Sequence, residues 1–311
     1  MSWEEVFPGS RINKSYINTS AVISISDKLN YFVSSCFFLG LSSKGAIRIE
    51  TTSDNVKTYV TTNRFESCSS GSQGGSLYFG EKGEFVQTKN SFINSTTSTD
   101  AQSFYIQVSQ MPNYKNHVNE TIVYNCGSSE QKGSITTSTF FGFQIMNQCN
   151  ITQNRVKSYI GGYKTEKISS DSYITCVNVI ENNQSQGYFN THSNYNESSS
   201  SMFKVTSCNY IKNKSPNNGN LIYSGSSNVA MFYCCIRENE ILITFRADHC
   251  TITFENSITD SNTSITSDGP SPIFKNTDIS FEQNCPLSII AAKELAQSNY
   301  FSVYLLPKRR H

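Results

Sequence analysis

The chain has 311 residues and a formal net charge of +1, and charged residues make up only 16% of it. It also contains 20 Phe and 17 Tyr. Low net charge with many aromatic residues excludes a highly charged disordered chain and favours β-strands. The near-zero charge balance also argues against a nucleic-acid-binding surface, which would need an excess of Lys and Arg.

The first 35 residues lack the pattern that dominates the rest of the chain. Residues 1–5 are acidic and do not show the basic, then apolar, start of a secretory signal. Residues 21–26 alternate between apolar and polar and predict a strand. We expect residues 1–35 to form an N-terminal cap. We find no stretch in the chain that is long and apolar enough to span a bilayer.

A short element recurs between residues 36 and 285: an apolar residue, two variable residues, then Asn, Ser or Cys. A small residue and an alternating apolar run follow it, as in residues 74–79. Another alternating run leads into the next copy, as in residues 231–234. The ten apolar anchors of this element are Phe37, Phe65, Phe92, Ile122, Ile151, Val179, Tyr210, Ile236, Ile258 and Phe281.

This repeat predicts the fold class. Three short strands in about 27 residues correspond to one coil of a parallel β-helix, in which neighbouring coils stack one strand spacing apart. A single coil cannot bury its inward residues alone, so the coils stabilise one another. We therefore predict an all-β protein, a single right-handed parallel β-helix solenoid of about ten coils formed by residues 36–285.

One polar position of the repeat lies three residues after the anchor. Asn tolerates the left-handed backbone of a tight turn, and stacked coils would bring identical amide side chains together. We interpret the column as a structural ladder, with a ligand groove as the alternative. Its members are Asn125, Asn154, Asn182, Asn213, Asn239 and Asn284.

Several cysteines lie two residues before an anchor or within one place of that position. A shared offset in a strand implies a shared face, so the sequence predicts either a stack of buried free thiols or disulfides between adjacent coils. No Cys-x-x-Cys pair is present, and we predict no metal site. The cysteines concerned are Cys149, Cys176, Cys208 and Cys234.

The C-terminal segment, residues 286–311, is predicted to be a second cap. Residues 288–297 place apolar side chains on one helical face and Lys293 and Glu294 on the other, which favours a helix covering the open end of the rod. A basic tail follows this helix at residues 308–311.

The repeat resembles that of the polymorphic outer-membrane-protein family. The anchor copies resemble its Phe-x-x-Asn element, and residues 74–77, Gly-Gly-Ser-Leu, resemble its Gly-Gly-Ala-Ile element. Chlamydial surface proteins and multigene families of trichomonad protists carry this repeat, and the Ser/Asn/Tyr-rich style here is closer to the protist forms. The resemblance spans about residues 36–285. It implies an adhesin-like role at a cell surface, with a protein or a glycan as partner.

The chain departs from those protist forms at one point. They usually carry a transmembrane helix after the repeats, and none follows Asn284 here. Surface display and a soluble paralogue are therefore both open interpretations.

Parallel β-helices also house polysaccharide lyases and hydrolases, which need paired carboxylates or calcium-binding acids on one outer face. His117, His192 and His249 occupy different offsets in the repeat and define no catalytic cluster. We interpret a row of acids as a solvated outer stripe: Glu66, Glu181, Glu238, Asp260 and Glu282.

We therefore predict a non-enzymatic, monomeric interaction protein that needs no cofactor. The alternative function is a divergent carbohydrate-active enzyme, a pectate-lyase-like lyase or hydrolase, which rests on fold analogy.

Overall fold

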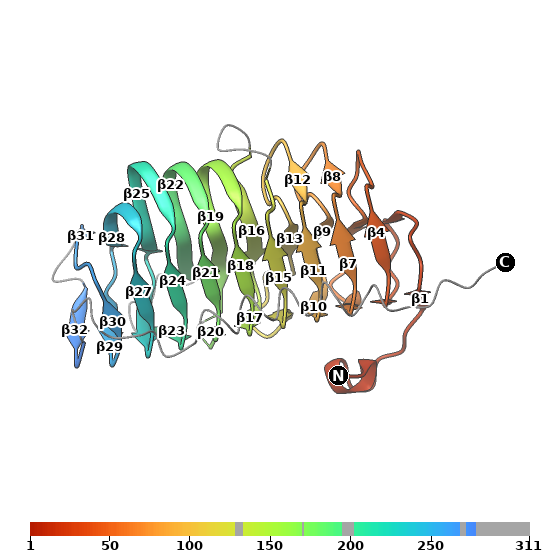
Figure 1. Cartoon of the computed structure of the whole chain (residues 1–311). Helices are drawn as coiled ribbons and strands as arrows, with labels where there is room; N and C mark the ends of the chain where they lie inside the picture. Colours follow the sequence, from red (N-terminus) through yellow and green to blue (C-terminus); the bar gives the residue numbers. More distant parts are fainter. Residues whose placement is uncertain (128–132, 170, 195–201, 268–271, 278–311) are drawn as a thin grey trace.

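A computed structural model describes residues 1–127, 133–169, 171–194, 202–267 and 272–277. In this part of the chain the secondary structure is almost entirely β, and the coils stack side by side along one axis from β1 to β32 (Figure 1). Neighbouring strands pair in parallel, each with the equivalent strand of the next coil. The predicted parallel β-solenoid is confirmed.

The strands form three long sheets, A, B and C, and a short fourth sheet. Sheet A contains β1 (Lys14–Ile17), β3 (Tyr31–Ser34), β6 (Lys57–Thr61), β10 (Glu84–Thr88), β14 (Lys115–Asn119), β17 (Phe143–Asn147), β20 (Tyr173–Thr175), β23 (Met202–Thr206), β26 (Asn228–Phe232), β29 (Ile252–Glu255) and β32 (Ile273–Lys275). Sheet B contains β2 (Ile23–Ile25), β5 (Ile47–Thr51), β9 (Leu77–Glu81), β13 (Phe104–Gln107), β16 (Ile135–Phe140), β19 (Arg155–Ile168), β22 (Asn183–Asn194), β25 (Lys214–Gly225), β28 (Glu240–Asp248) and β31 (Ser264–Thr266).

Sheet C is the narrowest of the long sheets, with strands of two or three residues. It contains β4 (Phe37–Leu39), β7 (Arg64–Glu66), β11 (Ser91–Ile93), β15 (Ile122–Tyr124), β18 (Asn150–Thr152), β21 (Asn178–Ile180), β24 (Asn209–Ile211), β27 (Cys235–Arg237) and β30 (Ile258–Thr259). The short fourth sheet pairs β8 (Ser69–Ser70) with β12 (Thr96–Thr97).

The described residues form about eight turns, where the sequence predicted about ten coils. The tenth anchor, Phe281, and the predicted helix at residues 288–297 lie outside the described residues. Within them, no helix has the length and apolarity that a membrane crossing requires.

Left-handed residues define both edges of sheet C. The residue that precedes the strand by two places has φ between 46° and 57° at all nine strands of sheet C, and none of these nine residues is glycine. They are Ser35, Thr62, Lys89, Glu120, Gln148, Cys176, Ser207, Tyr233 and Asn256. A second left-handed column follows the strand, from Gly40 to Glu238. These paired corners keep sheet C short and turn the residue beside each corner into the core.

The strand register corrects three predicted anchors by one residue. Phe38, Val123 and Thr259 are aligned with the other anchors, whereas Phe37, Ile122 and Ile258 point to the opposite face. Phe37 is accordingly 40% exposed, while Phe38 is fully buried. A slip of one residue reverses the face of every side chain in a strand. At Phe37–Phe38 and Ile122–Val123, two adjacent apolar residues left this choice undecided in the sequence. At Ile258 the structure instead turns the polar Thr259 inward.

The inward residues form one continuous core along the rod. At its N-terminal end Phe38, Phe65 and Phe92 stack on one another, with ring centroids 5.0 Å and 4.6 Å apart. Stacked identical rings bury large apolar area in the geometry that aromatic pairs favour.

The only helix in the described residues, α1 (Trp3–Val6), packs on the outside of sheet A. We call residues 1–10 the N-terminal strap. Its side chains Trp3, Val6 and Phe7 cover Phe32, Tyr59 and Val86 in an apolar cluster separate from the main core.

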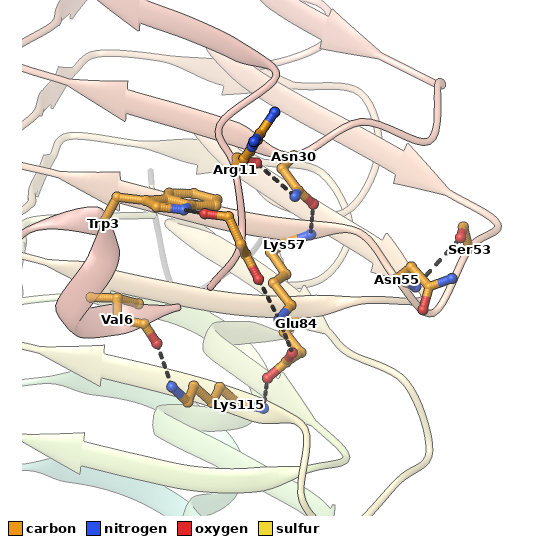
Figure 2. A network of polar contacts seen from close by, with 10 residues as sticks. Trp3, Val6, Arg11, Asn30, Ser53, Asn55, Lys57, Glu84 and Lys115 are labelled. Carbon is orange, nitrogen blue, oxygen red and sulfur yellow. Dashed lines mark hydrogen bonds and ion pairs between the residues drawn. The ribbon is translucent and has the colours of Figure 1, made fainter. Parts of the chain in front are cut away.

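Polar contacts surround the strap (Figure 2). Trp3 Nε1 donates to the Ser10 carbonyl (2.7 Å), and Lys115 Nζ donates to the carbonyl of Val6. Lys57 donates to Ser10 Oγ (2.9 Å) and pairs with Glu84 (3.7 Å). Together with the apolar cluster, these contacts hold the strap to four successive strands of sheet A: β3, β6, β10 and β14.

Candidate interaction surface

Four of the predicted Asn residues form the expected ladder. Asn182 Oδ1 accepts from both the backbone N–H (3.0 Å) and Nδ2 (2.9 Å) of Asn154. Asn213 and Asn239 repeat the same double contact with the preceding Asn. Each Nδ2 also donates to an anchor carbonyl of the coil before it, as Asn182 does to Ile151. The ladder thus satisfies amides and carbonyls that the corner would otherwise bury unpaired.

Asn125 does not belong to this ladder, which corrects the prediction. Its backbone has φ 50° and its exposed Nδ2 donates to Asn94 Oδ1 (2.7 Å), because the anchor of its coil is Val123. Cys126 takes the ladder position, and its N–H donates to Asn154 Oδ1 (2.8 Å). The left-handed residue of each corner lies one place before the ladder Asn. Asn is therefore favoured at the ladder position by its side chain and not by its backbone conformation. Asn284 lies outside the described residues.

A second ladder, which the sequence did not reveal, occupies the corner before sheet C. Asn90 Oδ1 accepts from the N–H (2.9 Å) and Nδ2 (3.0 Å) of Asn63. Asn63 Oδ1 accepts from the N–H of Cys36 (2.9 Å). Cys149, Cys208 and Cys234 occupy the equivalent position in later coils, two residues before the anchors Ile151, Tyr210 and Ile236.

The predicted cysteines are free thiols and do not form one unbroken stack. Cys208 and Cys234 are neighbours, but Val177 separates them from Cys149 in the register. The prediction was wrong for Cys176, which does not belong to the inward column. It is a half-buried, left-handed corner residue with its Sγ near Thr175 Oγ1. Cys235, next to Cys234, is disulfide-bonded.

Burial makes the inward thiols poor nucleophiles. It raises the pKa of Cys149 to about 12 and that of Cys126 to about 12. Since the thiolate is the reactive and metal-binding form, these cysteines act as small apolar core residues near neutral pH.

The acids of the predicted outer stripe do not occupy one position. Glu66 lies in β7 and pairs with Arg64 (2.7 Å), whereas Glu181 and Glu238 are left-handed corner residues. Glu238 pairs with Lys212 (3.5 Å). Asp260 accepts from the Glu238 N–H, and Glu282 lies outside the described residues.

The three histidines are also apart. His192 is buried in the core, where its Nε2 contacts Tyr163 Oη (3.0 Å), which in turn contacts Tyr210 Oη (2.7 Å). Burial lowers the pKa of His192 to about 3 and that of His117, in β14, to about 4. His249 lies at an exposed corner. In the part of the chain that is described, no three His, Cys, Asp or Glu side chains gather as a metal site.

The outer surface of sheet B carries a different arrangement, which we call the sheet B face. It consists of two columns on the side of the sheet away from the core, separated by one inward residue in each strand. The first column contains Arg48, Tyr78, Tyr105, Ser138, Lys164, Thr191, Tyr223 and Arg246, aligned through the strand register. Three side chains of the first column, Tyr105, Ser138 and Thr191, are nevertheless buried. The second column, two residues further on, contains Glu50, Gly80, Gln107, Phe140, Glu166, Gly225 and Asp248.

Rings and cations contact one another along the N-terminal half of this face. The guanidinium of Arg48 lies over the ring of Tyr78 (4.0 Å), which stacks on Tyr105 (5.3 Å). Tyr105 in turn contacts Phe140 (5.2 Å), and Lys164 Nζ lies over Phe140 (4.7 Å).

The C-terminal half continues the row through Tyr159 of β19, a neighbour of the two columns. Lys164 also lies near the ring of Tyr159 (5.5 Å), which contacts Tyr188 (6.3 Å). Tyr188 stacks on Tyr223 (4.2 Å), and Arg246 lies over both rings at 5.6 Å and 5.8 Å. The row of rings and cations is therefore unbroken from β5 to β28.

Each cation of the first column is paired with the acid that follows it in the second column. The Arg48–Glu50, Lys164–Glu166 and Arg246–Asp248 distances are 2.8, 2.5 and 3.1 Å. The sheet B face is therefore locally charged but neutral as a whole.

Two glycines let tyrosine side chains lean along their strands. A Cβ on Gly80 would stand 2.2 Å from Tyr78 Oη, and one on Gly225 would stand 2.7 Å from Tyr223 Oη. Each Tyr thus leans over the glycine two residues ahead and fills the space above it.

The sequence contains a pattern that indicates this surface and is separate from the period of the anchors. A cation or Tyr is followed two residues later by an acid or Gly at the same place in the repeat, as in Arg48-x-Glu50 and Tyr78-x-Gly80. Only the strand register shows that these pairs lie in line.

The fold and the sheet B face define the described part of the molecule as a parallel β-solenoid with an aromatic and ion-paired surface on sheet B. The chain matches no known family model, no curated protein and no solved structure.

Proposed function

We propose that the chain is a non-enzymatic interaction module that binds a protein partner through the sheet B face. The observation that carries the proposal is the unbroken row of Tyr, Phe, Arg and Lys side chains from β5 to β28. Tyr and Arg are enriched among the residues that dominate protein–protein binding energy. Their rings offer large, rigid contact area at low entropic cost.

The packing of the rings favours a protein over a glycan. Tyr78 and Tyr105, and likewise Tyr188 and Tyr223, stack face to face within the row. Their faces are therefore largely occupied, and the row offers ring edges, hydroxyls and charged groups to a partner. The family resemblance supports a cell surface as the place where this contact is made.

The proposal can be tested with cultured epithelial cells as the probe. The fluorescently labelled chain is compared with a Tyr188→Ser/Tyr223→Ser variant and with the control Tyr233→Ser. Tyr233 is 55% exposed at a corner where Ser207 stands in the coil before it, so the control leaves the sheet B face unchanged. We expect the double variant to bind at least about tenfold more weakly, as for loss of central interface aromatics, and the control to bind normally.

Two treatments of the cells separate the partner classes. Binding that trypsin removes supports a protein partner, and binding that only glycosidases remove contradicts it. Equal binding by the double variant would show that the face is not used. Release of reducing ends or unsaturated products from pectin, alginate or glycosaminoglycan would contradict the non-enzymatic assignment.

A further inference from the structure

The two columns of the sheet B face complement each other coil by coil. Where the first column has a cation, the second has an acid: Arg48 with Glu50 in β5, Lys164 with Glu166 in β19, and Arg246 with Asp248 in β28. The opposite order does not occur in these three strands. The charge pattern is therefore polarised across the face, in the same sense from one end to the other.

The complementarity is one of charge, because the small positions of the columns are already filled within the chain. The rings of Tyr78 and Tyr223 lie over Gly80 and Gly225 of their own strands, and Ser138 is fully buried. A surface that exchanged the two columns at constant height would meet charge with opposite charge in β5, β19 and β28.

A two-fold axis parallel to the rod makes this exchange. Rotation by 180° about a line that lies above the face, between the columns, brings the first column of one copy opposite the second column of another. It keeps every coil opposite its own counterpart. An isologous interface requires such self-complementarity.

We propose that the sheet B face binds a second copy of this chain in a parallel, two-fold symmetric dimer whose axis runs along the rod. An axis along the strands is disfavoured, because it would place Arg48 opposite Arg246 and Glu50 opposite Asp248. In the parallel dimer the Arg48–Glu50 pair instead faces its own reversed copy, so each cation has two acids near it. Such complementarity fixes register and excludes wrong partners.

The face is long enough for a stable contact. The eight strands from β5 to β28 are separated by seven spacings of about 4.8 Å, which gives a length of about 34 Å. At this length, a standard-size interface of about 800 Å² per partner would have to extend about 24 Å along the strand direction, so it includes the side chains that flank the two columns.

This inference rests on the proposed function, since it assigns a second occupant to the same face. The dimer covers the surface that binds cells, so only the monomer is free to bind them. A dimer also differs from the sequence-based prediction of a monomer. The register of the two columns, which the sequence does not show, is the reason for the difference.

A column-swapped variant tests the geometry. The variant reverses two ion pairs, through Lys164→Glu with Glu166→Lys and through Arg246→Asp with Asp248→Arg. Each pair stays within its own strand, so we expect the fold to be unchanged. In a parallel dimer the swapped chain is complementary to itself and repels the wild type. Sedimentation equilibrium measures self-association of each chain, and energy transfer between differently labelled chains measures mixing.

We expect the wild type and the swapped variant each to dimerise, and mixed dimers to be at least about tenfold weaker, the scale of close like-charge contacts. A Glu166→Lys/Asp248→Lys variant should be monomeric at concentrations where the wild type is dimeric. Its matched control exchanges an off-face pair, Lys212→Glu with Glu238→Lys, and should dimerise normally.

A wild type that stays monomeric, or a swapped variant that mixes freely with it, would overturn the dimer. Loss of cell binding in the Tyr188/Tyr223 variant would leave the proposed function standing even then. A dimer whose cell binding ignores those tyrosines would give the reverse result, so the two failures are distinguishable.

Discussion

The left-handed residues beside sheet C show how much backbone strain the repeat tolerates. Residues as different as Lys89, Cys176 and Tyr233 adopt φ near 55° at the same corner. Each costs about 1–2 kcal/mol relative to a right-handed conformation. The following residue turns inward and its N–H is hydrogen-bonded, as Cys36 is to Asn63 and Cys234 is to Ser257. Because position and not residue type determines this conformation, no local sequence preference reveals it.

His192 should make the solenoid sensitive to acid. Its pKa is lowered to about 3 by burial, so between about pH 3 and 6.5 the unfolded chain binds a proton that the native protein does not. Stability is therefore lost as pH falls below 6.5. At pH 5 the loss from this residue is about 1–2 kcal/mol.

The variant His192→Phe removes this contribution while keeping an aromatic side chain beside Phe203, which is 5.3 Å from the His192 ring. Urea unfolding at pH 7.5 and pH 5.0 should show a smaller acid-induced loss in the variant, by about 1–2 kcal/mol. The exposed His249→Gln is the matched control. Equal losses in the wild type and His192→Phe would contradict the prediction.

At the scale of the element, the presence of the strands could be predicted from the sequence. Which side chains of each strand point inward could be predicted only in part. The alternating runs at residues 74–79 and 231–234 overlap β9 and β26, because alternation indicates a strand with one buried face, but their bounds differ from those of the strands. The anchors at Phe37 and Ile122 were misplaced, since two adjacent apolar residues fit the pattern equally well. The sheet B face was missed because side-by-side columns depend on interstrand register, which a single strand does not contain.

The N-terminal strap is an element of a different kind, since its apolar cluster is separate from the main core. Phe7 is its central side chain, with the ammonium groups of Lys57 and Lys115 5.5 Å and 5.3 Å from its ring. A small satellite cluster of this kind should open before the solenoid does.

The variant Phe7→Ala should detach the strap at lower denaturant. Large-to-small changes at a buried Phe cost about 3–5 kcal/mol in well-packed cores, and we expect the lower part of that range at this peripheral site. Trp3 is the only Trp in the chain, so its fluorescence reports the strap and far-UV circular dichroism reports the sheets. In Phe7→Ala the Trp3 transition should precede the circular dichroism transition by more than in the wild type. Phe37→Ala, at an exposed site on sheet C, should leave the separation unchanged, and coincident transitions in Phe7→Ala would refute an independent strap.

At the scale of the whole molecule, the rod is a one-dimensional array in which each coil contacts chiefly its neighbours. The two Asn ladders divide it. Asn63 and Asn90 join the early coils at the corner before sheet C, and Asn154 to Asn239 join the later coils at the corner after it. The coil of β15, with Thr121 and Cys126 at these two positions, separates the ladders. Loss of the contacts of one ladder should therefore destabilise the coils on its own side of β15 and leave the other coils stable.

Asn213→Leu tests this division. The change removes the acceptor of the Asn182 N–H and Nδ2 and the donor to the Val179 carbonyl. Each buried group left without a partner costs about 1–3 kcal/mol, so opening of the later coils should become easier by several kcal/mol. Native-state hydrogen exchange should show faster exchange in β21 to β30 and little change in β4 to β11. Asn63→Leu should give the mirror pattern, with the early coils affected and the later ones protected. If either variant instead lowers protection uniformly along the rod, the coils unfold as a single cooperative unit and the ladders do not divide it.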